Sequence, residues 1–298
     1  MLLIRFQYIK VKPGGDLMVR FRLLGTLAIC GCIVAFALQL PGEKTYFIPF
    51  DEAQVQDQYS PKDLINFYQR LKKKKWRLVR HLYTSSLAGR KKRQKHTRIP
   101  KIIHQIWLEG PIPAEIRSIQ ASWTKLHPDW EYHLWTKEEV AFLYLQNRGY
   151  YDETDSLKIK SEILRYEILF QFGGVFVENN IACVRSFDIL TENLDFFAGL
   201  TDQIRSPRIS AALIGSIPSH PVMRDCLMNL RISRPKHPGS SLLTQSFLKV
   251  VKKRDPLDSV ALPATFLNPF PKDSEESHEE TSLYKTTFAV RNWEASIE

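Results

Sequence analysis

The chain has 298 residues, of which 44% are hydrophobic, and a formal net charge of +10. This length allows one sizeable domain with attachments, and four cysteines are too few for a disulfide framework. Cys183 and Cys226 either form one bridge or remain buried free thiols. The charge is uneven: residues 1–22 carry +4, 43–68 carry −3, 69–98 carry +13 and 99–298 carry −4, so the basic character belongs to the first third.

An apolar segment without charge covers residues 23–40 and is followed by acidic residues. As a helix, its 18 residues span about 27 Å, close to the hydrocarbon thickness of a bilayer. The positive-inside rule then predicts a cytosolic tail over 1–22 and a single-pass type II membrane protein. The domain after the anchor is expected in the Golgi lumen or, for a bacterial protein, at the inner membrane. A cleaved signal peptide and a buried core helix are the alternatives, but the run is long for a signal peptide and has no polar face.

Residues 41–98 resemble a basic stem. Ser60 and Pro61 are a typical helix start, and a helix to about Tyr83 is expected. Its lysines and arginines, with a second cluster over 90–98, would bind anionic lipid headgroups or an acidic partner, or belong to a solvated linker. Nucleic acid is not an expected partner, because aromatic residues are sparse here.

From Ile99 onward, apolar strands alternate with amphipathic helices, which predicts one α/β domain over 99–298. Strands are expected at 101–107, 130–135, 196–200 and 210–215. Thr136 and Glu139 have the spacing of a capping box, so a helix should begin there.

The most informative segment covers residues 159–180. Residues 159–172 are helix formers, Gly173 is placed to end that helix, and residues 175–177 predict a short buried strand. Side chains 178 and 180 then lie on one side of the strand end. A diphosphate and a divalent ion could be held at this point.

These residues resemble glycosyltransferase family 32. The likeness covers about residues 99–298. It rests on Ile99-Pro100-Lys101-Ile102-Ile103-His104-Gln105-Ile106-Trp107, Trp123, Pro128-Asp129-Trp130-Glu131-Tyr132-His133-Leu134-Trp135, 161–180, Ile214-Gly215-Ser216 with His220-Pro221, and Phe288-Ala289-Val290-Arg291-Asn292-Trp293. The resemblance implies a GT-A (Rossmann-like) fold and a GDP- or UDP-linked sugar donor, usually with Mn²⁺. It also implies transfer to a glycan or glycolipid hydroxyl with retention of anomeric configuration.

The resemblance also implies roles for particular residues. Trp107 would lie against the nucleotide base, Arg165 would contact donor phosphate or sugar, and Glu162 would contact sugar hydroxyls. By the residues alone, Glu162 and Arg165 could instead form a surface ion pair. The full set of expected donor-binding residues is Trp107, Glu162, Arg165, Phe176, Glu178, Arg291 and Trp293, and the expected catalytic residues are Glu162, Glu178 and Asn180.

Two positions depart from the family pattern. Its Asp-x-Asp is Glu178-Asn179-Asn180 here, and Arg291 stands where a histidine is usual. Glu178 and Asn180 remain as metal ligands, but an amide binds a hard cation more weakly than a carboxylate does and an arginine cannot coordinate one. Alternative functions are therefore a pseudo-glycosyltransferase that binds a sugar nucleotide or a partner without turnover, and a lipid-binding scaffold. A further hypothesis is that Arg291 partly replaces the metal ion in donor binding.

Overall fold

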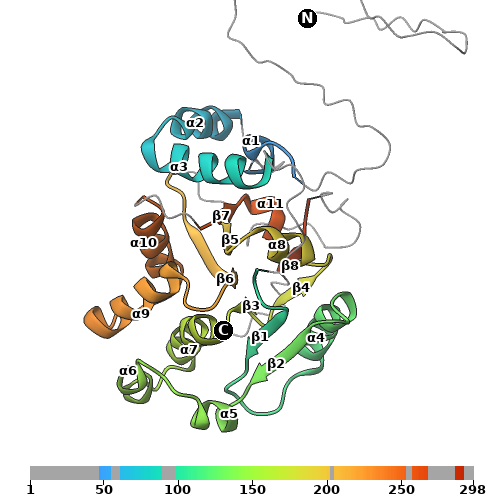
Figure 1. The fold of residues 1–298 in the computed structure, drawn as a ribbon, viewed down its shortest axis with the longest axis vertical. Coiled ribbons are helices and arrows are strands. Elements are labelled where there is room, and N and C mark those ends of the chain that lie inside the picture. The colour runs from blue at the N-terminus through green and yellow to red at the C-terminus, as the bar shows by residue number, and fades with distance from the viewer. Residues whose placement is uncertain are drawn as a thin grey trace, which may run out of the picture. The chain divides into compact units, whose positions relative to one another are not determined.

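The computed structural model describes residues 47–54, 61–88, 98–201, 205–252, 257–267 and 286–291, shown in Figure 1. The predicted cytosolic tail, the predicted transmembrane helix and Trp293 lie outside these ranges. Within these ranges, no helix is long and apolar enough to cross a membrane.

A six-stranded mixed sheet forms the centre of the domain, in the order β2-β1-β3-β6-β5-β7. Strand β1 runs parallel to both β2 and β3, whereas β6 runs antiparallel to β3 and β5. Its strands are β1 (Ile102–Ile106), β2 (Glu131–Trp135), β3 (Gly174–Val177), β5 (Phe196–Leu200), β6 (Ile209–Ser216) and β7 (Ser259–Leu262). A second, two-stranded sheet pairs β4 (Ile181–Cys183) with β8 (Ala289–Arg291).

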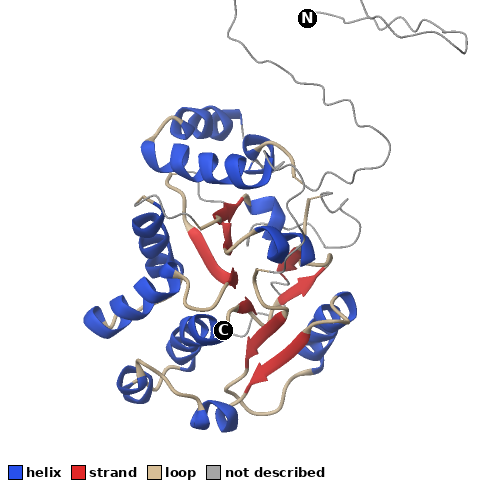
Figure 2. Cartoon of the chain, viewed as in Figure 1, coloured by secondary structure: helices blue, strands red, loops and turns tan. Residues whose placement is uncertain are grey.

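Helices surround the main sheet, as the colouring of Figure 2 shows. Three of them, α7, α9 and α10, pack together beside β1, β3 and β6, while α4 packs against β4 and α11 against β5 and β8. Their bounds are α4 (Ala114–Leu126), α5 (Lys137–Phe142), α6 (Arg148–Glu153), α7 (Leu157–Phe172), α8 (Asp188–Asn193), α9 (Pro221–Ser233), α10 (Ser240–Val251) and α11 (Ala264–Leu267).

The predicted α/β alternation after residue 99 is confirmed. Each of the four strands expected at 101–107, 130–135, 196–200 and 210–215 is present, with bounds shifted by one residue at most. Thr136 caps α5 in the expected capping box with Glu139. Cys183 and Cys226 are buried free thiols, so the alternative of a bridge between them is not realised.

The region expected to be a stem differs from the prediction, because helices precede residue 99 and share the core of the domain. They are α1 (Phe50–Gln54), α2 (Pro61–Leu71) and α3 (Lys74–Tyr83), followed by one π-helical turn, Thr84–Ala88. The single helix predicted to Tyr83 is two helices, because the chain turns at residues 72–73. The turn brings Phe67 edge-on to Trp76, with ring centroids 5.7 Å apart.

The outer face of α3 is basic, and its inner face is buried. Trp76 and Tyr83 are each 1% exposed, and α3 packs against β7. Burying two large aromatic side chains stabilises the fold by several kcal/mol, about 1.5–3 for each. The compact unit therefore includes residues 47–88, and the expected boundary at 98/99 does not separate a stem from a domain.

Candidate functional site

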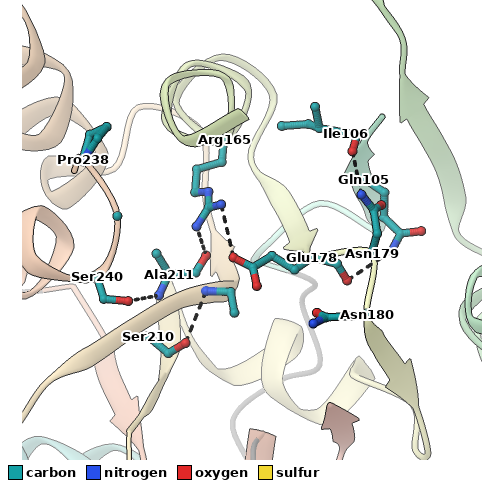
Figure 3. Close-up of polar contacts among 12 residues, drawn as sticks. Gln105, Ile106, Arg165, Glu178, Asn179, Asn180, Ser210, Ala211, Pro238 and Ser240 are labelled. Carbon is teal, nitrogen blue, oxygen red and sulfur yellow. Dashed lines mark hydrogen bonds and ion pairs between the residues drawn. The ribbon is translucent and has the colours of Figure 1, made fainter. Parts of the chain in front are cut away.

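The candidate site lies where β1 and β3 end. These strands are parallel neighbours, so the residues that follow them, Trp107 and Glu178, come to the same edge of the sheet. Asn179 links the two strand ends, because its Nδ2 donates to the carbonyl oxygen of Ile106 at 2.8 Å. Figure 3 shows the polar contacts at this edge.

Two glycines set the path from α7 into β3. Gly173 and Gly174 have φ values of +66° and +89°, a region that side-chain-bearing residues rarely adopt. A Cβ on Gly174 would lie 2.6 Å from the carbonyl oxygen of Ile102, so no side chain fits there. The turn keeps α7 close to β3 and thereby places Arg165 of α7 beside Glu178.

Glu178 is held by two guanidinium groups. Arg165 Nη2 lies 3.3 Å from its Oε1, and Arg291 Nη1 lies 3.0 Å from its Oε2. Burial alone would raise the pKa of Glu178, but the charges and hydrogen bonds of the two arginines outweigh it and lower the pKa. Glu178 is thus ionised at neutral pH, and its side chain remains 33% exposed.

Arg165 is almost buried, with 5% of its side chain exposed. Its Nη1 donates to the carbonyl oxygen of Ala211 at 2.6 Å, and its guanidinium lies 4.7 Å from the ring centroid of Phe176. The buried Nε has no hydrogen-bond partner among the described residues. Arg165 therefore orients Glu178, and the direct donor contact that the resemblance implied has little surface available to it.

Phe176 does not present a face to a ligand. It lies in β3 between β1 and β6 and is 2% exposed. Expected as a donor contact, it instead packs beneath Arg165, because a central strand covered by helices buries its side chains on both faces.

Glu162 lies one turn before Arg165 on α7 but does not pair with it, so the surface ion pair considered above is not formed. Within the described part of the chain, Glu162 makes no hydrogen bond. Burial raises its pKa, against the opposing charges of Arg165 and Lys158. A Cβ on Gly239 would lie 2.6 Å from Glu162 Oε1, so the glycine leaves room for this carboxylate. A half-buried acid without a partner is suited to receive a polar ligand group.

Asn180 and Arg291 meet across the small sheet. Ile181 is paired in register with Arg291, and Arg291 Nη1 donates to Asn180 Oδ1 at 3.2 Å. The expectation that Arg291 lies beside the altered motif is therefore met. Asn180 is 9% exposed, which leaves it little surface for a catalytic contact.

The oxygen atoms at this strand end do not fit a divalent ion. Among the described residues directly after β3, Glu178 supplies the carboxylate, and both of its oxygens are within reach of a guanidinium. Asn180 Oδ1 accepts a hydrogen bond from the same Arg291, and Asn179 Oδ1 is buried. Hard cations prefer several anionic or carbonyl oxygens, and a guanidinium among them repels the ion. No group of three or more potential metal-ligating side chains occurs among the described residues.

Trp107 is close to the site but mostly buried, at 7% exposure. Its Nε1 donates to the carbonyl oxygen of Gly110 at 2.7 Å, which folds the loop after β1. Its predicted contact with a nucleotide base stays a prediction. Trp293 lies outside the described residues.

The sequence did not indicate two polar residues that support the site. Gln105, in β1, is fully buried, accepts from the Tyr132 hydroxyl at 2.5 Å and donates to the carbonyl oxygen of Glu178 at 3.5 Å. The hydroxyl of Tyr166 donates to the carbonyl oxygens of Pro238 and Gly239, and so fixes the segment beside Glu162. Each of the two is a polar residue within an apolar run. That feature could have indicated them, because buried polar groups need hydrogen-bond partners.

The central region of the chain is similar to known proteins. A family model described as "Glycosyltransferase sugar-binding region containing DXD motif" matches residues 113–197. Inositol phosphoceramide mannosyltransferase 3 of Schizosaccharomyces pombe is 31% identical over 136 residues, which are 44% of this chain and 37% of that protein. Mannosyl phosphorylinositol ceramide synthase SUR1 of Saccharomyces cerevisiae is 30% identical over 138 residues, 45% of this chain and 35% of that protein.

Other matches are weaker in identity or in structure. An uncharacterized glycosyltransferase of Acanthamoeba polyphaga mimivirus is 26% identical over 186 residues, with 57% of this chain and 73% of that protein covered. The solved structure of PaToxG glycosyltransferase aligns with a TM-score of 0.45 at 15% identity, over 65% of this chain and 81% of that one. The chain thus spans less than two fifths of the length of the two yeast relatives. As the resemblance to glycosyltransferase family 32 predicted, residues 113–197 of this chain match the model of the sugar-binding region of DXD-motif glycosyltransferases.

Proposed function

We propose that this chain is a glycosyltransferase that moves a sugar from a nucleotide sugar to a hydroxyl of a glycan or glycolipid, with retention of anomeric configuration. One observation carries the proposal. Within the matched region, Glu178 at the end of β3 is ionised, partly exposed and held between Arg165 and Arg291. A GT-A arrangement of the mixed sheet, with the donor at this edge, is part of the same proposal.

The chemistry assigned to the site follows from charge. When the bond between the sugar and the diphosphate breaks, negative charge develops on the departing phosphate, and a nearby fixed cation stabilises it. Arg291 supplies such a cation, and Glu178, oriented by Arg165, accepts hydrogen bonds from ribose or sugar hydroxyls. Glu162, without a hydrogen bond among the described residues, holds the sugar in the same way.

The acceptor is proposed from the relatives. The curated relatives are named for mannosyl transfer to inositol phosphoceramide, so mannose and a glycolipid headgroup are the first substrates to test. A membrane anchor at 23–40 and a lumenal domain, both predicted from the sequence, would place the site beside such an acceptor.

A transfer assay tests the proposal. The full chain is incubated with GDP-mannose, and separately with UDP-linked hexoses, in micelles containing inositol phosphoceramide, and the products are measured by mass spectrometry. We expect a glycolipid heavier by one hexose, and a loss of product in Glu162→Ala. Binding of the donor without product would favour the pseudo-glycosyltransferase, and neither binding nor product would refute the proposal.

A further inference from the structure

The guanidinium group of Arg291 lies at the point where the polar side chains after β3 converge. Its Nη1 is 3.0 Å from Glu178 Oε2 and 3.2 Å from Asn180 Oδ1. These are the two side-chain oxygens expected to ligate a metal ion. A positively charged group of the chain itself thus lies against them.

Two guanidinium groups share one carboxylate in this cluster. Arg165 and Arg291 contribute two positive charges and Glu178 one negative charge. The positive charge of Arg291 is fixed, because an arginine side chain keeps its proton in proteins. Such a cluster attracts an anion, and a guanidinium matches the geometry of phosphate oxygens.

The position of Arg291 is fixed by packing. Strand β8, which ends at Arg291, pairs with β4, and the neighbouring Phe288 is fully buried. Trp123 of α4, also fully buried, donates through Nε1 to the carbonyl oxygen of Ile181, the residue opposite Arg291. The arginine is therefore held in place before any ligand arrives, which favours tight binding because little order is lost.

The two arginines differ in exposure and therefore in role. Arg165 has 5% of its side chain exposed and its Nη1 directed to a carbonyl oxygen, so it acts on Glu178. Arg291 has 15% exposed and lies beside the more accessible Glu178, so it is the cation that a ligand can reach.

From this geometry we infer that Arg291 takes the place of a metal ion and binds the diphosphate of the donor, so that donor binding does not require a divalent cation. The inference rests on the proposed function, since it concerns the same site. The competing explanation is that Arg291 only fastens β8 to the loop after β3.

Titration calorimetry separates these explanations. The full chain, purified in micelles, is titrated with GDP, UDP, ADP and CDP, each in EDTA and again with Mn²⁺. We expect one of these to bind in EDTA, with an affinity that Mn²⁺ changes less than twofold. Arg291→Ala should weaken that binding in EDTA by about ten- to a hundredfold. Arg80→Ala, which removes the same charge from the exposed face of α3, should bind as the wild type does.

A second variant distinguishes charge from fastening. Arg291→Gln keeps hydrogen-bond donors for Glu178 and Asn180 but has no charge, so it should melt near the wild-type temperature and still bind weakly. If Arg291→Gln or Arg291→Ala binds as tightly as the wild type, the inference is wrong. If Arg291→Gln fails to fold, the fastening role is the correct one.

The double variant Asn180→Asp with Arg291→His tests the inference from the other direction. It replaces an amide and a guanidinium with a carboxylate and an imidazole, which with Glu178 are suitable metal ligands. We expect it to bind the nucleotide only with Mn²⁺, and binding in EDTA equal to the wild type would contradict the inference. Wild-type binding that needs Mn²⁺ also overturns it but leaves the proposed function intact, whereas no binding under either condition overturns both.

Discussion

Glu167 on α7 and Glu178 after β3 both place a carboxylate inside the domain, but their partners differ. Glu167 is fully buried and accepts from three uncharged N–H groups: the backbone N and Nδ2 of Asn147 at 2.8 and 3.0 Å, and the backbone N of Gln146 at 3.1 Å. Glu178 is one-third exposed and has two charged partners on different elements, α7 and β8.

The difference shows how one residue type serves two purposes. Neutral donors satisfy Glu167 and fasten the loop before α6 to α7, while burial raises the pKa of this acid. The arginines instead lower the pKa of Glu178 and hold its side chain from two elements of the fold. We therefore expect Glu167, which accepts from amide N–H groups, to contribute to stability. We expect Glu178, which is shared between two cations, to lie where an anion can bind.

The largest expected effect is on stability and comes from changing Glu167. Glu167→Ala removes the acceptor shared by three N–H groups, two of them on buried Asn147, so it should lower the free energy of unfolding by about 2–4 kcal/mol. Glu167→Gln keeps an acceptor oxygen and should lose less. Urea denaturation measures both, with Glu153→Ala on the exposed end of α6 as the control. A Glu167→Ala protein as stable as the control would remove the distinction between the two glutamates.

Arg165→Ala should have the next largest effect and should act on both stability and binding. It leaves the carbonyl oxygen of Ala211 without its donor and Glu178 with one cation, which we expect to cost about 1–3 kcal/mol of unfolding free energy. Chemical denaturation measures the stability, and calorimetry with the nucleotide measures the binding. An Arg165→Ala protein with unchanged stability would show that the buried arginine is not a structural partner of Glu178.

Glu162→Ala should change binding and leave stability almost unchanged, because this acid has no hydrogen bond to lose within the described residues. Affinity for the nucleotide sugar should fall by about tenfold, corresponding to one lost hydrogen bond, while affinity for the matching nucleoside diphosphate should be unchanged. Equal losses for both ligands would place Glu162 at the phosphates instead of the sugar.

The smallest expected effect is on how the free energy of unfolding depends on pH. Glu178 and Glu167 should change it in opposite directions. The folded-state pKa of Glu178 is lowered, so its stabilising contribution is present above the unfolded pKa near 4.5 and is lost as the pH falls through the lower folded value. The folded-state pKa of Glu167 is raised, so stability falls as the pH rises from about 4.5 through the higher folded value.

Unfolding curves between pH 3 and 7 should therefore differ in opposite ways for Glu178→Gln and Glu167→Gln. Relative to the wild type, the first should lose its dependence below about pH 4.5 and the second its dependence above it. Parallel curves for the two variants would show that the two carboxylates share one environment.

Local patterns in the sequence predicted the elements that carry the site. The helix ended by Gly173 and the strand after it follow from helix formers, a glycine with positive φ and a short apolar run. The pairing of Arg165 with Glu178 instead of Glu162 was not predictable in the same way. It depends on how closely the glycine turn brings two elements together, which is a matter of three-dimensional packing.

The sequence pattern also did not predict where the domain begins. Charge made residues 69–98 resemble a solvated stem, yet the apolar faces of α2 and α3 contribute to the common core. Lys72–Lys75 are exposed, so their charge indicates only the outer surface of this region and not its buried faces. Tyr83 of α3 contacts the ring of Phe266, which lies far along the chain, and no local rule gives that contact.

The packing of α1–α3 determines where the protein can be cut for laboratory production. Tyr83 contacts the ring of Phe266 at a centroid distance of 6.0 Å, Gln54 accepts from the backbone N of Ala264, and Thr265 donates to the carbonyl oxygen of Ala53. A truncated protein that starts at residue 99 would present these surfaces to water and should be recovered in inclusion bodies. One that starts near residue 45 retains them and is the version to express for crystallisation.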